Sequence, residues 1–277
     1  MNQKDVFADL HTHTDASDGV LSPAALVRRA AERGIEVLSV TDHDTIEGLE
    51  SALEAAQETD IHVVVGIELS VTLDGEEIHV LAYGFEPSHA GLRRHLQAMQ
   101  EARRTRAREI VQRLRDQGVE VEDDRLRAAI GSARAVGRPH VAAALVRGGH
   151  VDTPGEAFER YLGRGKPGYV AKPAFAADDA LTLIHDAGGV GVLAHPGHWT
   201  SGAQVRRLVE AGLDGLETRH PSHDDSLRGY YDRLARGCDL FATGGSDYHG
   251  RTDEEEMHFG TVGMSRSAWE RFRTAIA

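Results

Sequence analysis

The sequence predicts an α/β fold of parallel β/α units that a helical segment interrupts. Short apolar runs alternate with helical patterns up to residue 65 and again after residue 177, as expected for parallel strands joined by helices. Between residues 88 and 164 no strand pattern is present, and glycines break a series of helical segments. We therefore expect one α/β domain from residues 1–87 and 165–277, with a helical insertion domain at 88–164.

The first half of the α/β domain has clear start and stop signals. Ser22-Pro23 is a typical helix beginning, because Ser caps the first turn and Pro fits the first helical position. Gly34 marks the end of that helix, and Asp74-Gly75 suits the tight turn of a hairpin. The expected elements are strands near 6–8, 35–40 and 61–65, helices from Pro23 up to Gly34 and at 46–59, and hairpin strands at 69–73 and 77–83.

The insertion and the second half have similar signals. Within the insertion, helices are expected near 90–117, 123–131, 138–147 and 154–163. The glycine-rich run from Gly163 to Gly168 is typical of an exit hinge. After it, strands are expected at 190–194, 214–217 and 240–243, with helices at 177–187, 202–211 and 224–236.

Composition excludes several classes of protein. The formal net charge of −13 argues against broad non-specific binding to nucleic acid or anionic lipid. No apolar run reaches the roughly 18 residues of a membrane span. Cys238 is the only cysteine, which excludes an internal disulfide, and the N-terminus lacks the apolar region of a signal peptide. We expect a cytoplasmic protein with no obligate protein partner.

Positive charge is concentrated at the start of the insertion. Six arginines fall within one short segment, at Arg103, Arg104, Arg106, Arg108, Arg113 and Arg115. With Glu101 and Glu109 among them, they are typical of a solvated helix face. The same run is also a local attractor for phosphate on an acidic protein, and both interpretations stay open.

The stretch from Asp9 to Gly19 carries the first candidate site residues. Alternate side chains of a strand share a face, so His11 and His13 point the same way and are able to hold one ion. Asp18 lies just past the strand end, where a loop can return it toward the same point. One histidine pair is weak evidence in a chain with 16 histidines, so the interpretation depends on the other strands.

Further histidines and carboxylates stand at comparable places. These are His43, Glu68, His195, Asp247 and His249 after predicted parallel strands, and His79 in the hairpin. The carboxyl ends of parallel strands meet on one face of a closed barrel. Singly, each residue suits a hydrogen-bonded turn, a half-buried strand or the surface. Together they favour a site for ions such as Mn, Fe or Zn, and about nine candidate ligands are too many for one ion.

These motifs together resemble the PHP family, named for polymerase and histidinol phosphatase. The matching runs are Asp9-Leu10-His11-Thr12-His13-Thr14 with Ser17-Asp18-Gly19, Thr41-Asp42-His43-Asp44, Gly66-Ile67-Glu68, Leu193-Ala194-His195-Pro196-Gly197 and Gly245-Ser246-Asp247-Tyr248-His249. The resemblance implies a distorted (β/α)7 barrel and three divalent ions, with Mn²⁺ first and Fe²⁺ or Zn²⁺ as alternatives. Asp18 and the helical insertion are similar to the group of nucleoside 3′,5′-bisphosphate phosphatases and 5′-to-3′ exoribonucleases.

The resemblance also implies which residues bind the ions. One ion is expected to be held by His11, His13, Glu68 and Asp247. A second is expected between a bridging Glu68, His79 and His195, and a third among Asp18, His43 and His249. Three further aspartates, Asp9, Asp42 and Asp44, are expected to orient the imidazoles.

Two other clusters are expected to contact substrate. Arg138 and His140 stand at the start of a predicted helix in the insertion, a place that suits a phosphate group. His220 and His223 follow a predicted strand and are candidates for binding phosphate or protonating the leaving group. The alternative interpretations are a capped, solvated turn for the first pair and a polar loop for the second.

The expected activity is metal-dependent hydrolysis of phosphate monoesters of small nucleotides, for example of a nucleoside 3′,5′-bisphosphate to a nucleoside 5′-phosphate. A hydroxide activated by the metal ions attacks phosphorus, so no side chain serves as nucleophile. The alternatives are a 5′-to-3′ exoribonuclease on short RNA, a phosphatase of the histidinol-phosphate type, and a non-catalytic module that assists a polymerase. The expected partner is thus a small phosphorylated nucleotide or short RNA, and not a membrane.

Overall fold

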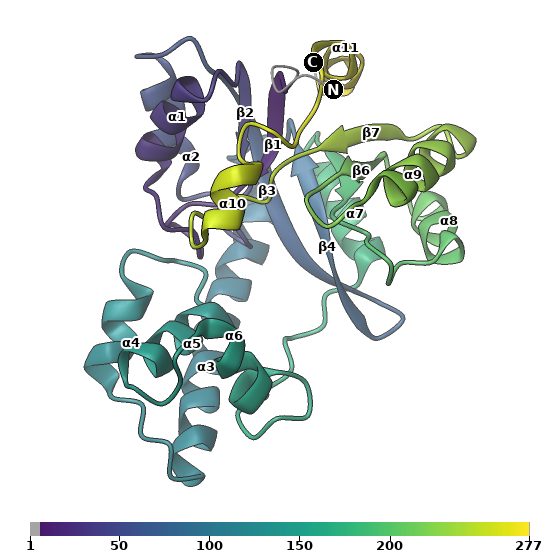
Figure 1. Cartoon of the computed structure of the whole chain (residues 1–277). Coiled ribbons are helices and arrows are strands. Elements are labelled where there is room, and N and C mark those ends of the chain that lie inside the picture. Colours follow the sequence, from purple (N-terminus) through teal and green to yellow (C-terminus); the bar gives the residue numbers. More distant parts are fainter. Residues whose placement is uncertain (1–5, 277) are drawn as a thin grey trace. The chain divides into compact units, whose positions relative to one another are not determined.

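A computed structural model describes residues 6–276 of the chain. The chain divides into two compact units. The first runs up to Arg94 and resumes at Ala174, and the second spans His95–Pro173. Figure 1 shows all labelled strands in the first unit and the short helices α4, α5 and α6 in the second. Within the described residues, none of the helices combines the length and the apolar content that crossing a membrane requires.

The first unit contains a seven-stranded sheet that curls into a nearly closed barrel. Its strands lie in chain order as β1 (Ala8–Thr12), β2 (Val37–Val40), β3 (His62–Leu73), β4 (Glu76–Tyr83), β5 (Val190–Leu193), β6 (Gly215–Arg219) and β7 (Phe241–Gly244). Neighbours are parallel except where β4 pairs with β3 and with β5. The open edges meet because the Asp247 N–H donates to the His11 carbonyl and the His13 N–H donates to the Tyr248 carbonyl, both at 2.9 Å. The expected distorted (β/α)7 barrel is confirmed.

Helices cover the outside of this sheet. They are α1 (Pro23–Glu32), α2 (Leu49–Ala56), α7 (Ala177–Asp186), α8 (Gly202–Glu210), α9 (Asp225–Gly237), α10 (Asp253–His258), α11 (Arg266–Phe272) and the 3₁₀ turn η2 (Arg273–Ala275). One apolar core joins α1 and α2 to β2, with Leu26 and Leu38 fully buried. A second core packs Trp269 and Phe272 of α11 against Tyr83 of β4. Burial of such side chains from water is what stabilises the barrel.

The sequence analysis missed α10 and α11, although each begins with a recognisable signal. The side chain of Thr252 accepts a hydrogen bond from the Glu255 N–H, and that of Ser265 accepts one from the Ala268 N–H. A hydroxyl three residues before the bonded amide is the usual N-cap arrangement. These caps were visible in the sequence.

The strand that carries Glu68 is longer than expected. Two strands with a break after residue 65 were expected, yet β3 runs unbroken from His62 to Leu73, so Glu68 lies inside a strand and not at its end. The first part of β3 pairs with β2 and the second with β4. Gly66 lies where the partner changes, and a Cβ there would be 2.1 Å from the Ser39 hydroxyl oxygen. The glycine therefore allows β2 to lie close while β3 continues.

The second unit is a helical bundle with its own core. It contains most of α3 (Ala90–Asp116), then α4 (Asp123–Ile130), α5 (Arg138–Arg147), α6 (Pro154–Ala157) and the π-helical turn η1 (Phe158–Leu162). Leu114, Val141 and Leu145 are buried together in it. The boundary between the units falls inside α3, several residues later than the pattern suggested, because the first turn of α3 belongs to the barrel unit.

The arginine run of α3 is partly structural. Arg103 and Arg106 are each 5% exposed. The Arg106 Nε donates to the Val170 carbonyl at 2.8 Å, and the Arg113 Nη1 donates to the Tyr169 carbonyl at 2.7 Å. These bonds tie α3 to the segment that leaves the unit, whereas Arg108 remains exposed. A simple solvated face therefore does not describe the whole run.

Candidate metal centre

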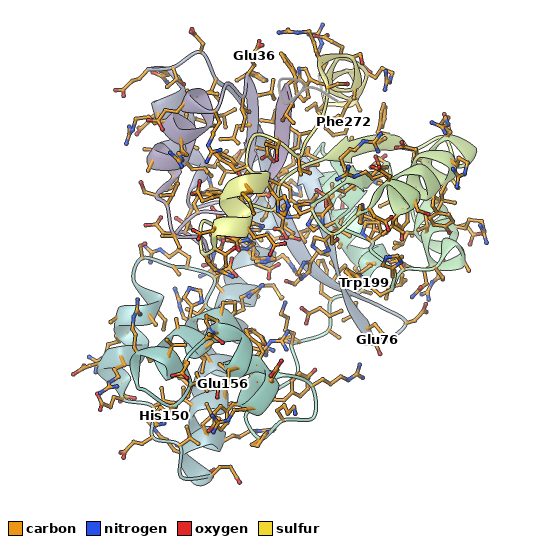
Figure 2. The ribbon with its side chains drawn as sticks, viewed as in Figure 1. Glu36, Glu76, His150, Glu156, Trp199 and Phe272 are labelled. Carbon is orange, nitrogen blue, oxygen red and sulfur yellow. The ribbon has the colours of Figure 1, made fainter. Side chains whose placement is uncertain are left out.

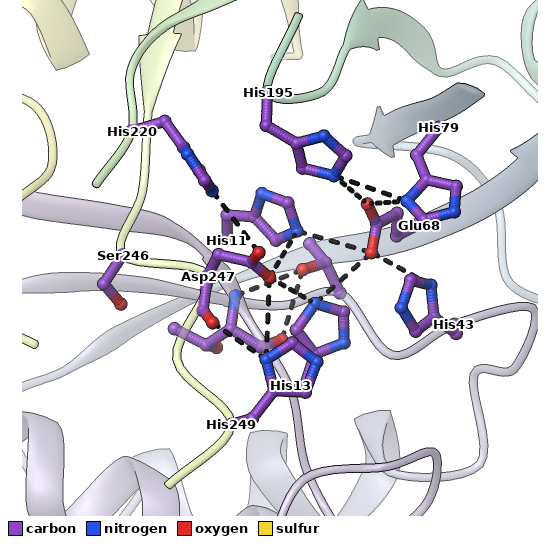
Figure 3. Close-up of polar contacts among 12 residues, drawn as sticks. His11, His13, His43, Glu68, His79, His195, His220, Ser246, Asp247 and His249 are labelled. Carbon is purple, nitrogen blue, oxygen red and sulfur yellow. Dashed lines mark hydrogen bonds and ion pairs between the residues drawn. The ribbon is translucent and has the colours of Figure 1, made fainter. Parts of the chain in front are cut away.

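Glu68 is a buried carboxylate surrounded by imidazole rings. Five histidines place a ring nitrogen within 3.4 Å of its oxygens, namely His79 at 2.9 Å, His43 and His195 at 3.0 Å, His13 at 3.3 Å and His11 at 3.4 Å. Figure 3 shows these rings turned toward the carboxylate from β1, β4 and the segments that follow β1, β2 and β5. A carboxylate has about four lone-pair directions. Five converging rings therefore exceed what hydrogen bonding to Glu68 alone explains.

Asp247 and Asp18 extend the cluster. Asp247 Oδ1 lies 3.3 Å from His11 Nε2 and 3.1 Å from His13 Nε2. Asp18 Oδ1 lies 3.3 Å from His249 Nε2. The result is four overlapping groups whose ligand atoms lie within 4.8 Å of one another: His13, Asp18, His43 and His249; His11, Glu68 and His195; His11, His13 and Asp247; and His43, Glu68 and His79. All the candidate ligands selected from the sequence belong to at least one group.

The atoms at the centre fit a divalent cation. His11 Nε2, His13 Nε2 and Glu68 Oε2 are buried and have no partner with hydrogen-bond geometry in the described chain. Each buried polar atom without such a partner costs about 1–3 kcal/mol. Imidazole nitrogen and carboxylate oxygen are the donors that Mn, Fe and Zn accept. Coordination of a cation would satisfy all three atoms.

The electrostatics of the cluster favour a cation as well. Burial opposes the charge of Glu68, Asp247 and Asp18, but the surrounding imidazoles outweigh it and hold the pKa of each carboxyl well below its usual value. Burial also opposes protonation of His13, yet the nearby carboxylates of Asp247 and Glu68, at 3.1 and 3.3 Å, raise its pKa to about 10. Burial lowers the pKa of His43 to about 4. Three ionised carboxylates in one buried cluster attract positive charge.

Two candidate ligands have unusual backbone conformations. His195 has φ of 25° and Asp247 has φ of 51°, in the left-handed region that non-glycine residues rarely adopt. The Glu217 carboxylate accepts a 2.7 Å hydrogen bond from the His195 N–H, and the His11 carbonyl accepts one from the Asp247 N–H. Such conformations persist where the surroundings hold them, and they are common at functional sites.

Glu217 is a site residue that the sequence analysis did not select. It is fully buried on β6. Its Oε1 accepts a 3.0 Å hydrogen bond from His11 Nδ1, and its Oε2 accepts the bond from the His195 N–H. Because Nδ1 of His11 carries the proton, Nε2 presents its lone pair to the cluster. The signal that could have revealed Glu217 is a carboxylate in the apolar strand next to the one that ends at His195.

Replacing Glu217 by Gln should weaken metal binding by about 10- to 100-fold, the usual effect of removing a partner that orients a ligand. The amide of Gln has only one acceptor oxygen. It therefore cannot accept hydrogen bonds from both the His11 ring and the His195 N–H, as the carboxylate does. Manganese content after dialysis and titration of the stripped protein with Mn²⁺ would measure the change. Asp232→Asn is the control, because Asp232 pairs with Arg219 and not with a candidate ligand. Unchanged manganese affinity in a folded Glu217→Gln protein would contradict the role.

Two of the aspartates expected to orient imidazoles accept hydrogen bonds from residues next to candidate ligands. Asp9 accepts hydrogen bonds from the N–H (2.9 Å) and the hydroxyl (2.6 Å) of Ser246. Asp42 accepts hydrogen bonds from the N–H (2.7 Å) and the hydroxyl (2.6 Å) of Thr14. Ser246 precedes Asp247 and Thr14 follows His13. Asp9 and Asp42 therefore hold the loops that carry Asp247 and His13, and their expected role in orienting imidazoles stays a prediction.

His220 and His223 have different environments. His220 is 8% exposed, and its Nε2 lies 3.3 Å from Asp247 Oδ2. Its Nδ1 accepts a 3.1 Å hydrogen bond from the Ser222 N–H, so the neutral ring carries its proton on Nε2. His223 is 1% exposed, accepts from the Gly197 N–H and contacts the Thr218 carbonyl. Both of its nitrogens face backbone, so His223 joins the Gly197 loop to β6, and its expected role toward substrate stays a prediction.

Arg138 and His140 lie in the helical unit. The His140 ring is buried, and its Nδ1 accepts a 3.1 Å hydrogen bond from the Gly137 N–H. The guanidinium of Arg138 lies 5.7 Å from the centre of the Phe158 ring. Their expected role in substrate binding stays a prediction.

A barrel that gathers imidazoles and carboxylates in one buried cluster is the architecture of a metal-dependent hydrolase. Comparison with known proteins agrees. The model of the family described as PHP domain matches residues 9–131. A protein of Haemophilus influenzae named 5′-3′ exoribonuclease is 38% identical over 246 residues, which cover 87% of this chain and 89% of that protein. The chain belongs to the PHP family.

Two further comparisons agree with a hydrolase. A 3′,5′-nucleoside bisphosphate phosphatase of Chromobacterium violaceum is 34% identical over 246 residues, covering 87% of this chain and 86% of that protein. A structure described as an amidohydrolase from Chromobacterium violaceum, with bound sulfate and no metal, superimposes with a TM-score of 0.88 at 30% identity, covering 98% of this chain and 97% of that one. The protein is therefore a metal-dependent phosphoesterase, a hydrolase that acts on phosphoester bonds.

Proposed function

We propose that the protein hydrolyses the bond between phosphorus and the 3′-oxygen of a nucleotide that carries a 5′-phosphate, with a nucleoside 3′,5′-bisphosphate as the first candidate substrate. The observation that carries the proposal is the convergence of five imidazoles on the single buried carboxylate of Glu68. Such a cluster suits several cations held close together, which is the arrangement used to bind and hydrolyse phosphate esters. The similarity to a 3′,5′-nucleoside bisphosphate phosphatase supports the substrate.

The resident ions in this proposal are three divalent cations, with Mn²⁺ first and Fe²⁺ or Zn²⁺ as alternatives. The proposed ligands are His11, His13, Asp18, His43, Glu68, His79, His195, Asp247 and His249. Glu68 would offer a carboxylate oxygen to more than one ion, because both of its oxygens face imidazoles. When bound, the ions supply an activated water and offset the charge on the phosphate oxygens.

Side chains around the cluster have their own parts in the reaction. Glu217 keeps the His11 ring in the tautomer that leaves Nε2 available, and holds the backbone of His195. The His220 Nε2–H, oriented by Ser222, is suited to donate to a phosphate oxygen or to the departing 3′-oxygen. Proton donation at this point lowers the cost of releasing an alkoxide. No serine or cysteine nucleophile is needed in this scheme.

A 5′-to-3′ exoribonuclease is the second candidate, favoured by the 38% identity to the Haemophilus influenzae protein of that name. An exonuclease that releases nucleoside 5′-phosphates breaks the same bond, between phosphorus and the 3′-oxygen of a 5′-phosphorylated nucleotide. Only the group on the far side of the phosphorus differs. The phosphatase and the exoribonuclease activities therefore need the same catalytic arrangement. They differ in the space required for the group on the far side of the phosphorus.

A substrate screen with Mn²⁺ separates the candidates. Adenosine 3′,5′-bisphosphate should release phosphate and leave adenosine 5′-phosphate, faster than adenosine 3′-phosphate or adenosine 5′-phosphate is hydrolysed. Short 5′-phosphorylated RNA should be tested beside it, with nucleoside 5′-phosphates as the product to detect. If histidinol phosphate were the only compound hydrolysed, the proposal would be wrong. Preference for RNA over the bisphosphate would select the second candidate.

A further inference from the structure

A tryptophan is exposed on the loop that carries His195. The indole of Trp199 is 66% exposed, the most of any large hydrophobic side chain in the described part of the chain, whereas Trp269 is 5% exposed. Trp199 stands four positions after His195, between β5 and α8, and Figure 2 shows it at the surface of the molecule. Single exposed apolar residues are common in proteins, so the surroundings of Trp199 decide whether its exposure indicates a binding site.

The loop around Trp199 is held firmly. The Thr200 N–H donates to the Pro196 carbonyl at 3.1 Å, which closes a turn with His198 and Trp199 at its exposed tip. The hydroxyl of the fully buried Tyr231 donates to the Gly197 carbonyl at 2.7 Å and lies 3.1 Å from the Thr200 carbonyl. Buried groups thus fix both sides of the turn, while the indole itself stays in water.

The indole also packs against its own loop. A Cβ at Gly197 would lie 2.5 Å from Cη2 and Cζ2 of Trp199 and 2.7 Å from Cε2. The six-membered part of the ring therefore lies against the backbone of Gly197, where a larger residue would displace it. Gly197 also has φ of 54°, a second reason for glycine there. One side of the ring is packed on the loop, and much of its surface faces solvent.

We propose that Trp199 is a stacking platform for the nucleobase of the substrate. The inference rests on the proposed function, because a nucleobase is present only if the substrate is a nucleotide. A flat, exposed ring on the loop that carries the candidate ligand His195 suits recognition of any base, since every base has a π-face. Stacking is tolerant of base identity, so Trp199 would favour nucleotides over phosphorylated sugars without selecting one base.

Fluorescence tests the stacking directly and needs no turnover. The probe is adenosine 5′-phosphate, with ribose 5-phosphate as the same phosphate and sugar without a base. Adenosine 5′-phosphate should quench the tryptophan emission of the Mn²⁺-loaded protein in a saturable way, and ribose 5-phosphate should not. Trp199→Phe should lose the quenching, because Trp269 is buried. Quenching that persists in Trp199→Phe, or its absence from the natural protein, would overturn the proposal.

Competitive inhibition of phosphate release measures how much stacking on Trp199 contributes to binding. Loss of stacking typically weakens binding of a base by about 5- to 150-fold. Trp199→Ala should raise the inhibition constant of adenosine 5′-phosphate by about 10-fold or more and leave that of ribose 5-phosphate unchanged, with partial recovery in Trp199→Phe. Leu53→Ala, on the surface of α2, is the control for removing an exposed apolar side chain.

The outcomes distinguish the inference from the function on which it rests. Equal weakening of both inhibitors by Trp199→Ala would mean that the tryptophan only supports the loop, and the stacking proposal would be wrong. If the natural protein does not hydrolyse nucleotides at all, the proposed function fails. The fluorescence titration still reports in that case whether a base stacks on Trp199.

Discussion

Replacing Asp247 by Asn should reduce phosphate release by more than about 10³-fold while leaving the fold intact. Loss of one preorganised electrostatic contact to a reacting phosphoryl or acyl group costs about 10²- to 10³-fold, and Asp247 contributes to holding an ion as well. Asn is preferable to Ala here, because Asp247 has φ of 51° and Asn tolerates the left-handed region better than Ala does. The amide keeps the shape and removes the charge that faces His11 and His13.

The matched control is Asp239→Asn. Asp239 has φ of 55°, is exposed, and lies between α9 and β7, so the substitution is chemically identical in the same backbone region. Turnover of the control should equal that of the natural protein. Circular dichroism and thermal unfolding should show that both variants are folded. Substantial turnover by a folded Asp247→Asn protein that retains its full complement of metal would refute the assignment of Asp247 as a ligand.

Removal of metal should abolish activity and also lower thermal stability. Exhaustive dialysis against a chelator should bring phosphate release to background, and added Mn²⁺ should restore it. Ions that bind only the folded protein stabilise it, and at free metal 100 times the dissociation constant the gain is about 2.7 kcal/mol. The buried atoms His11 Nε2, His13 Nε2 and Glu68 Oε2 explain why the stripped protein should be the less stable one.

Two measurements check this expectation together. Metal content should be determined on the same samples used for the rates, and the unfolding temperature followed as Mn²⁺ is added. The rise in unfolding temperature should be smaller in Asp247→Asn than in Asp239→Asn. Full activity in protein whose metal content is negligible would end the case for metal-dependent catalysis.

Much of the site could be predicted because its residues lie at positions that the local sequence pattern identifies. His11 lies on β1 and His13 comes directly after it, and His195 follows a predicted strand directly. Such positions are read from periodicity and from the ends of apolar runs. His79 is marked less clearly, because it lies in the predicted hairpin and does not follow a predicted parallel strand. In the structure its Nδ1 lies 2.9 Å from Glu68 Oε1.

Other features depend on the direction in which a side chain points, which the periodicity of the sequence does not encode. Glu217 occupies one position in an apolar strand, and nothing nearby in the sequence says that its two oxygens reach His11 and His195. The ring of His223 turns toward the backbone of Gly197 and Thr218, although His220, three residues away, faces Asp247. These contacts join segments brought together by the curl of the sheet.

The sequence by itself determined the class of fold, the helical insertion and the candidate ligands, because apolar periodicity, helix caps and the chemistry of imidazole and carboxylate are local properties. Only the tertiary structure decided that β3 continues through Glu68, that five rings converge on this carboxylate, and that Glu217 lies behind them. The physical reason is that side-chain direction depends on strand register and on how the sheet closes, with the Asp247 N–H bonded to the His11 carbonyl.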